Sequence, residues 1–277
     1  MPSLTEDGIF VTKQEAYCLY YVCFLIAFLA CIIGKICGMG GGVIIKPVLD
    51  AVGVLSISAI NFLSGVTVLG MTCWSVGKSL IRRESAINLS VSTPLALGAA
   101  IGGLAGKQLF TFVAALFADA ETAGGVQAGL LFAATLATLF YTLNKQRLPM
   151  YGVRNPLLCI IIGLGLGMLG TFLGIGGGPF NMAVLYFFFS MSTKVAAQNS
   201  LYIILISQAA GLLATALSGG IPNLSLALLG GMIVCGVIGG DVGGHLNRKL
   251  SEQWVTVLFE ASMLLVMVIC IYNMVLH

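Results

Sequence analysis

The sequence Gly-Met-Gly-Gly-Gly at residues 38–42 recurs as Gly-Ile-Gly-Gly-Gly at residues 174–178, each time between two apolar stretches. Farther along, Ile-Gly-Gly at residues 101–103 recurs at residues 238–240, at an offset that differs from the first by one residue. Two motifs that recur in the same order at nearly the same spacing indicate an internal repeat. The polar linker at residues 145–154 divides the halves. We therefore predict three parts: an extracytoplasmic tail at residues 1–16, a first repeat at residues 17–147 and a second repeat at residues 148–277.

The stretches around these motifs have the composition of membrane helices. The chain is 58% hydrophobic and 8% charged, whereas soluble domains carry about 25% charged residues. Several apolar runs approach or exceed the roughly 20 residues that span a bilayer: residues 17–36, 95–116, 126–143, 157–173, 195–217 and 255–276. Long uninterrupted runs favour helices over the alternating strands of a barrel. The predicted fold is an all-α, multi-pass protein of the plasma (inner) membrane.

Composition also argues against several other classes of protein. The net charge of +3 comes from basic residues in short loops rather than from a basic patch, so we expect no nucleic-acid partner. The eight cysteines lie in or beside apolar runs without paired spacing, which is typical of reduced packing residues. With only His245 and His277, the chain cannot supply the usual metal or nucleophile-and-base set, so we expect no metal, no cofactor and no enzyme activity.

Loop charges predict the orientation of the helices, because Lys and Arg concentrate in short cytoplasmic loops. Three basic groups mark cytoplasmic loops: Lys78, Arg82 and Arg83; Lys145, Arg147 and Arg154; Arg248 and Lys249. The acidic N-terminus, the segment around Asp119 and the neutral turn at residues 218–223 are predicted outside. The chain must cross the membrane an odd number of times between the cytoplasmic linker at Arg154 and the external turn at Gly220. This holds if each glycine cluster separates a helix from a short returning helix, with Lys194 at the cytoplasmic side. Each half then has three full crossings plus a hairpin, or five crossings if the hairpin arms span the membrane. Both counts are odd, so the halves are inverted repeats, as in many secondary transporters.

The glycine clusters are the predicted site of function. Each glycine in a helix interior costs about 1 kcal/mol relative to alanine, so consecutive glycines indicate a break in the helix. A break inside a membrane frees backbone N–H groups and presents the positive end of the next helix, which favours an anion. The predicted substrate-binding residues are Lys35, Gly38, Gly40, Gly41, Gly42, Asn61, Ser64, Gly174, Gly176, Gly177, Gly178, Gln198, Asn199 and Ser200.

Each of these assignments has a structural alternative. Glycines also permit close helix packing, which we expect for the later clusters at residues 102–106 and 239–243. Lys35 could extend its ammonium group to the membrane interface. Hydroxyl and amide side chains such as Asn199 could instead form hydrogen bonds between helices.

Three ionisable residues are candidates for proton coupling, because titratable groups within membrane spans often form proton relays. They are Asp241, His245 and Glu260. His245 could instead be an interfacial residue beside Arg248, and Glu260 could pair with a basic loop residue.

The paired Gly-x-Gly-Gly-Gly motifs, followed in each half by an Ile-Gly-Gly-x-x-Gly helix, resemble the TauE/SafE family of sulfite exporters. The resemblance covers residues 32–250 and implies a permease for small inorganic or organosulfur anions such as sulfite and organosulfonates. Family members often carry a proline several residues after the glycines in both halves. Pro47 fits this pattern, but Ala183 occupies the matching place in the second half, where Pro179 follows the cluster directly.

The predicted function is a secondary transporter, exporter or exchanger, that moves small sulfur-containing anions across the lipid bilayer. Alternating access would operate at a midplane site between the two glycine breaks. The alternatives are a passive anion channel, which could use the same donors, and a membrane-embedded enzyme. The sequence leaves open whether the protein forms a homodimer.

Overall fold

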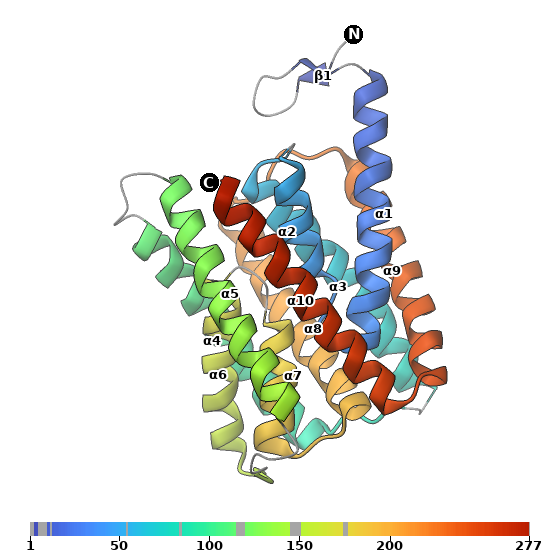
Figure 1. The fold of residues 1–277 in the computed structure, drawn as a ribbon, viewed down its shortest axis with the longest axis vertical. Coiled ribbons are helices and arrows are strands. Elements are labelled where there is room, and N and C mark those ends of the chain that lie inside the picture. The colour runs from blue at the N-terminus through green and yellow to red at the C-terminus, as the bar shows by residue number, and fades with distance from the viewer. Residues whose placement is uncertain are drawn as a thin grey trace.

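The computed structural model describes residues 3–4, 10–11, 13–53, 55–82, 85–114, 120–144, 151–173 and 177–276. Ten helices carry almost all of the described chain, and only Ser3–Leu4 (β1) and Phe10–Val11 (β2) pair as two short antiparallel strands. The prediction of an all-α fold is confirmed (Figure 1).

Five helices precede the linker and five follow it. The first five are α1 (Lys13–Cys37), α2 (Gly42–Val52), α3 (Ile57–Ile81), α4 (Leu89–Ala114) and α5 (Ala120–Asn144). The second five are α6 (Pro156–Phe172), α7 (Gly178–Phe189), α8 (Thr193–Leu217), α9 (Leu226–Lys249) and α10 (Glu252–Leu276). Helix α1 begins within the segment predicted as an extracytoplasmic tail.

Helices α1, α3, α4, α8, α9 and α10 each contain an apolar stretch of 19 to 25 residues, long enough to cross a membrane. In contrast, α2 and α7 have only 11 and 12 residues, too few for a crossing. Large apolar side chains such as Ile81, Leu217 and Leu226 are 80–85% exposed in the isolated chain, as expected for surfaces that face lipid. The chain is therefore a multi-pass membrane protein.

The helix breaks lie where the glycine clusters predicted them. Between α1 and α2, Gly38 and Gly40 both have a φ of +71°, a conformation that residues with a side chain rarely adopt. Between α6 and α7, Gly177 has a φ of +85°. Gly174 and Gly176 lie outside the described residues. Figure 1 places α2 towards the end of the molecule that holds the N-terminus and α7 towards the opposite end, so the two hairpins enter from opposite sides.

Two closely packed helix pairs confirm the packing role predicted for the later glycines. On α4, a Cβ placed on Gly102 would lie 2.0 Å from the carbonyl oxygen of Leu164 on α6. On α9, a Cβ placed on Gly239 would lie 2.5 Å from the carbonyl oxygen of Phe28 on α1. Because no side chain fits at these distances, the glycines allow backbone-to-backbone contact.

The packing partners of the helices follow a two-fold pattern. Helix α9 packs on α1 and α3, and its counterpart α4 packs on α6 and α8. Likewise, α2 packs on α3 and α7 packs on α8. An inverted repeat predicts these matched pairs, because exchanging the halves converts each pair into the other.

The hairpin formed by α6 and α7 gives a testable topology. Single cysteines at Arg154 and Lys194, in a background without the eight native cysteines, should react with a membrane-impermeant reagent from the cytoplasmic side. A cysteine at Gly220 should react from the outside, because α8 crosses between Lys194 and Gly220. Labelling of Arg154 and Lys194 from opposite sides would contradict the returning arm of the hairpin.

Candidate functional site

The tips of the two hairpins meet inside the protein. A Cβ placed on Gly178 would lie 2.0 Å from the carbonyl oxygen of Met39, so the start of α7 packs directly on the first break. A Cβ on Gly38 would lie 2.3 Å from the Cα of Ala197 on α8. Helices α2 and α7 begin after Gly41 and Gly177, and neither residue supplies a side-chain cap. Two helix N-termini without side-chain caps therefore lie at the junction of the hairpins.

Two buried hydroxyl groups accompany this junction. Ser64 on α3 and Ser200 on α8 are both 0% exposed, and within the described part of the chain their Oγ atoms have no hydrogen-bond partner. The Oγ of Ser64 would lie 3.2 Å from a Cβ placed on Gly42. A buried hydroxyl without a partner costs about 1–3 kcal/mol, so a pair of them calls for an explanation.

Ser200 lies on the face of α8 that contacts the first break. Ala197 contacts Gly38 and Ile204 contacts Gly40. Residues three and four apart in a helix share a face, so Ser200 lies between these two contacts. Both of the unpartnered hydroxyls are thus carried by helices that pack on the break.

Asn199 has a structural role in this arrangement. Its Oδ1 accepts a hydrogen bond from the Asn88 backbone N–H at 2.8 Å, and its Nδ2 donates to the carbonyl oxygens of Ala86 and Val195 at 3.1 and 2.7 Å. The Ser92 hydroxyl also donates to Oδ1. The amide's two donors and its acceptor are therefore occupied. The bonds with Ala86 and Asn88 join α8 to the connection between α3 and α4, whereas the bond to Val195 lies within α8.

The other predicted amides differ in position. Asn61 is exposed on α3, so its side chain does not share the buried environment of the breaks. Gln198 accepts a hydrogen bond from the Ala86 N–H at 2.9 Å, and its side chain lines a cavity. Of the predicted amides, Gln198 is the one placed where a ligand could reach it.

That cavity has a volume of about 280 Å³ and lies between α1, α3, α8 and α9. Its basic residues are Lys35, Lys78, Lys194 and Arg248, and its acidic residue is Asp241. Its other lining residues are His245, Gln198, Asn247, Ser75, Ser79, Ala197, Leu201, Gly240 and Gly244. Ala197 also packs against Gly38, so one wall of the cavity adjoins the first break.

Lys35 enters this cavity from the last turn of α1. A Cβ placed on Gly243 would lie 3.0 Å from the Lys35 Cβ, and one on Gly244 would lie 3.5 Å from its Cε. The glycines of α9 therefore make room for the lysine side chain. Among the described residues, no hydrogen bond or ion pair engages the Lys35 ammonium group, so its charge is available to a ligand.

Sequence reasoning missed the basic residues that share the cavity with Lys35. Lys78, Lys194 and Arg248 were interpreted only as markers of cytoplasmic loops. They lie in the last turn of α3, the first turn of α8 and the last turn of α9. All three are predicted on the cytoplasmic side of the membrane. Because helix ends on the same side can lie close together, this shared side was a signal that they could line one cavity.

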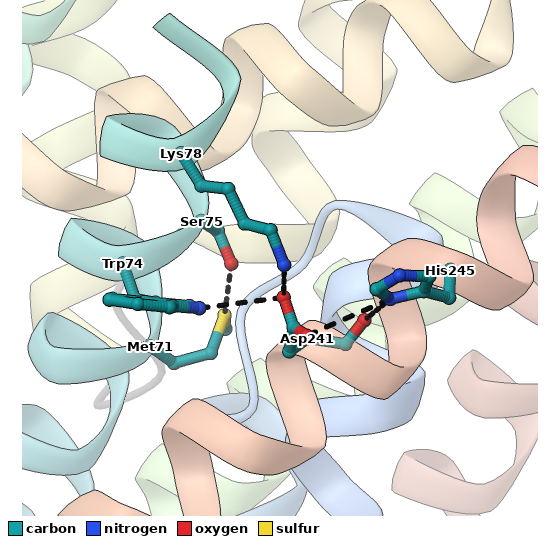
Figure 2. A network of polar contacts seen from close by, with 6 residues as sticks. All are labelled: Met71, Trp74, Ser75, Lys78, Asp241 and His245. Carbon is teal, nitrogen blue, oxygen red and sulfur yellow. Dashed lines mark hydrogen bonds and ion pairs between the residues drawn. The ribbon is translucent and has the colours of Figure 1, made fainter. Parts of the chain in front are cut away.

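Asp241 is the centre of a polar network at one wall of the cavity (Figure 2). Its Oδ1 forms an ion pair with the Lys78 ammonium group and accepts a hydrogen bond from the Trp74 Nε1–H at 3.4 Å. The Nδ1 of His245 lies 2.8 Å from the Asp241 backbone oxygen and 3.7 Å from Oδ2. Glu260, on α10, is not among the lining residues of this cavity.

The fold is that of a polytopic helical membrane protein, and a predominantly basic cavity lies between α1, α3, α8 and α9. Residues 23–270 match the family Sulfite exporter TauE/SafE, and the chain belongs to this family. The resemblance inferred from the glycine motifs is thereby confirmed.

A curated relative supports the class of protein. The Probable membrane transporter protein YunE of Bacillus subtilis (strain 168) is 31% identical over 108 residues. The match covers 39% of this chain and 38% of that protein. No solved structure matches the chain.

Proposed function

We propose that the protein is a secondary transporter, exporter or exchanger, of small sulfur-containing oxoanions such as sulfite or organosulfonates. The observation that carries this proposal is the convergence of four basic side chains in a cavity whose wall adjoins a broken helix. The family name agrees with export of such an anion, and the name of the Bacillus subtilis relative agrees with membrane transport.

The charge of the cavity favours an anionic substrate. Four basic residues face a single carboxylate, which leaves a net positive field within low-dielectric walls. Such a field raises the local concentration of anions and speeds their entry. The basic residues lie on the predicted cytoplasmic side, where an exported anion would bind first.

The size and lining of the cavity favour a small, hydrated ion. Its volume of about 280 Å³ corresponds to roughly nine water molecules at about 30 Å³ each. Most lining side chains are charged or polar, and Leu201 is the largest apolar one. A compact oxoanion with part of its water shell fits this lining better than a molecule with a long apolar tail.

From the cavity, the anion would move to the junction of the hairpins. There the hydroxyls of Ser64 and Ser200 and the freed N–H groups at the starts of α2 and α7 would replace its lost water. Lys35, three residues before Gly38, would link the two positions electrostatically. The glycines at both breaks have no side chains, so the backbone N–H groups there could approach the ion closely.

Alternating access would follow from the two hairpins and their packing partners. The exposed His245 and the basic helix ends on the predicted cytoplasmic side line the cavity, so we infer that the structure is an inward-facing state. Movement of α1 with α9, and of α4 with α6, would close this cavity and open one on the other side. The inverted repeat remains the basis of this part of the proposal.

Lys35→Met should weaken sulfite binding by about 10- to 100-fold, since a hydrogen bond to a charged group contributes about 1.5–3 kcal/mol. Binding can be measured as the concentration dependence of thermal stabilisation of the purified protein. Lys107→Met is the matched control, because Lys107 is exposed and hydrogen-bonded to Thr215, outside the cavity. Equal losses in both variants would assign Lys35 a structural role instead.

The function itself can be tested with a panel of sulfite, methanesulfonate, sulfoacetate, sulfate and acetate. We expect a sulfur oxoanion to stabilise the purified protein and to show saturable flux in proteoliposomes. Acetate should have the weakest effect if the site selects a tetrahedral or pyramidal oxoanion. Ohmic current steps without saturation would indicate a channel and would overturn the carrier mechanism.

A further inference from the structure

We propose that the transporter moves a proton together with its anion, and that the Asp241 carboxylate is the proton-binding site. This inference rests on the proposed anion transport. It starts from an anomaly in the cavity: a carboxylate lies among groups that attract anions, where it repels the substrate and engages one of the four basic side chains.

The position of Asp241 on α9 brings it directly against α3. A Cβ on Gly240, the preceding residue, would lie 2.5 Å from the Met71 side chain of α3, so α3 and α9 approach closely here. The carboxylate then receives two donors from α3, the Lys78 ammonium group and the Trp74 N–H. Lys78 also lies 6.0 Å from the Trp74 ring centroid, which helps to hold it beside the acid.

An incoming anion competes with Asp241 for Lys78. When the anion binds the ammonium group, Asp241 loses its counter-charge and gains a negative neighbour. Both changes favour the neutral carboxyl form. One proton from water then binds an Asp241 oxygen, and one anion binds at Lys78, so no net charge is left unpaired by the exchange.

Four other charged or titratable residues line the cavity in which Asp241 and Lys78 lie. They are Lys35 on α1, Lys194 on α8, and His245 and Arg248 on α9 itself. Lys35, Lys194 and Arg248 add positive charge to the walls of the cavity, so they favour the anion and do not take the place of the proton. His245 has a side chain 59% exposed and lies 3.7 Å from Asp241 Oδ2, so it is a solvent-exposed neighbour of the carboxylate.

If the proton and the anion each strengthen the binding of the other, anion affinity depends on pH. If anion binding requires one proton on Asp241, anion affinity should fall about tenfold for each pH unit above neutral. Asp241→Asn keeps the size of the side chain but cannot take up a proton. Its anion affinity should lose this dependence and exceed that of the wild type at high pH, because Lys78 no longer has a charged competitor.

The experiment compares wild type and Asp241→Asn by thermal stabilisation with sulfite and methanesulfonate over about two pH units around neutral. Methanesulfonate stays ionised throughout, whereas sulfite itself takes up a proton. The difference between the proteins therefore isolates the proton bound by the protein. Glu260→Gln is the matched control, since it removes another carboxylate on a membrane helix but not one in the cavity.

Asp241→Asn leaves Lys78 without its partner and could reduce folding. The double variant Asp241→Asn/Lys78→Met removes both charges and should fold with the wild-type yield. It should bind the anion more weakly and without the tenfold dependence on pH. In proteoliposomes at clamped membrane potential, anion uptake by the wild type should acidify the lumen, and uptake by both variants should not.

The possible outcomes separate this inference from the proposed function. A wild-type pH dependence in Asp241→Asn, or its loss in Glu260→Gln, would overturn the assignment of the proton to Asp241. If anions bind and move without any acidification, anion transport stands and proton coupling is wrong. If no anion of the panel stabilises the wild type, the proposed function fails and the coupling fails with it.

Discussion

Replacing both Ser64 and Ser200 with alanine should nearly abolish anion binding and, at the same time, make the empty protein more resistant to heat. Both hydroxyls are fully buried and have no hydrogen-bond partner among the described residues. If they serve the anion, each contributes a charge-assisted hydrogen bond of about 1.5–3 kcal/mol. Loss of both should weaken binding by about 10²- to 10⁴-fold.

The opposite effect on stability follows from the same geometry. Without the anion, each hydroxyl is a buried polar group with an unmet hydrogen bond, and alanine removes that cost. We expect each single variant to raise the melting temperature of the ligand-free protein. Thermal unfolding with and without sulfite measures both effects on one sample.

A buried hydroxyl that has its partner is the matched control. Thr142 on α5 donates to the Thr138 carbonyl oxygen at 2.8 Å, so Thr142→Val should lower stability or leave it unchanged, and should not alter anion affinity. The proposed central site is wrong if the Ser64 and Ser200 variants are stabilised yet bind the anion as well as wild type.

Gly178→Val should prevent the hairpin tips from meeting and should therefore abolish both folding and transport. The Cβ alone would lie 2.0 Å from the Met39 carbonyl oxygen, and neither backbone has a flexible end that could move aside. We expect a loss well above the roughly 1–3 kcal/mol typical of an overpacked core. Gly165→Ala, on α6 with nothing within 4 Å of the added Cβ, is the control and should fold normally.

Milder variants at neighbouring glycines separate folding from transport. In Gly177→Val the residue would need a φ near +85°, which costs roughly 1–2 kcal/mol for a residue with a side chain. In Gly41→Val the added Cβ would lie 2.7 Å from the Cys31 Sγ and 3.2–3.3 Å from backbone atoms of Cys31 and Ala30, so α1 would have to move slightly away from the break. Both proteins should be recoverable but impaired in flux. Wild-type flux in both would show that the clusters serve packing alone.

The hairpins could be predicted from the sequence because their signal is local. A run of glycines ends a helix wherever it occurs, since each glycine raises the cost of continuing the helix. Gly38, Gly40 and Gly177 have the positive φ that only glycine adopts readily, and α2 and α7 start directly afterwards. The orientation of the helices was predicted from another local signal, the concentration of Lys and Arg in some of the loops.

The cavity could not be predicted, because it depends on which helices pack together. Lys78 and Asp241 are separated by 163 residues and pair only because the glycines of α9 bring α3 close. Asn199 was expected to bind substrate, yet it bonds to a loop 111 residues away. Spacing along one helix carries no information about such partners, whereas the equal offset of Ser64 and Ser200 was visible in the repeat itself.

The packing of α1 on α9 and of α6 on α4 has a consequence for how the protein is made. Each hairpin is held by a helix from the other half of the chain. The Asn247 amide, for example, donates to the Ile36 carbonyl oxygen across 211 residues of sequence. Helix α1 therefore reaches its main partner only after a further 211 residues have been synthesised, and such distant contacts form slowly. We expect neither half expressed alone to accumulate, whereas co-expression of residues 1–147 and 148–277 should restore a stable, transport-competent protein.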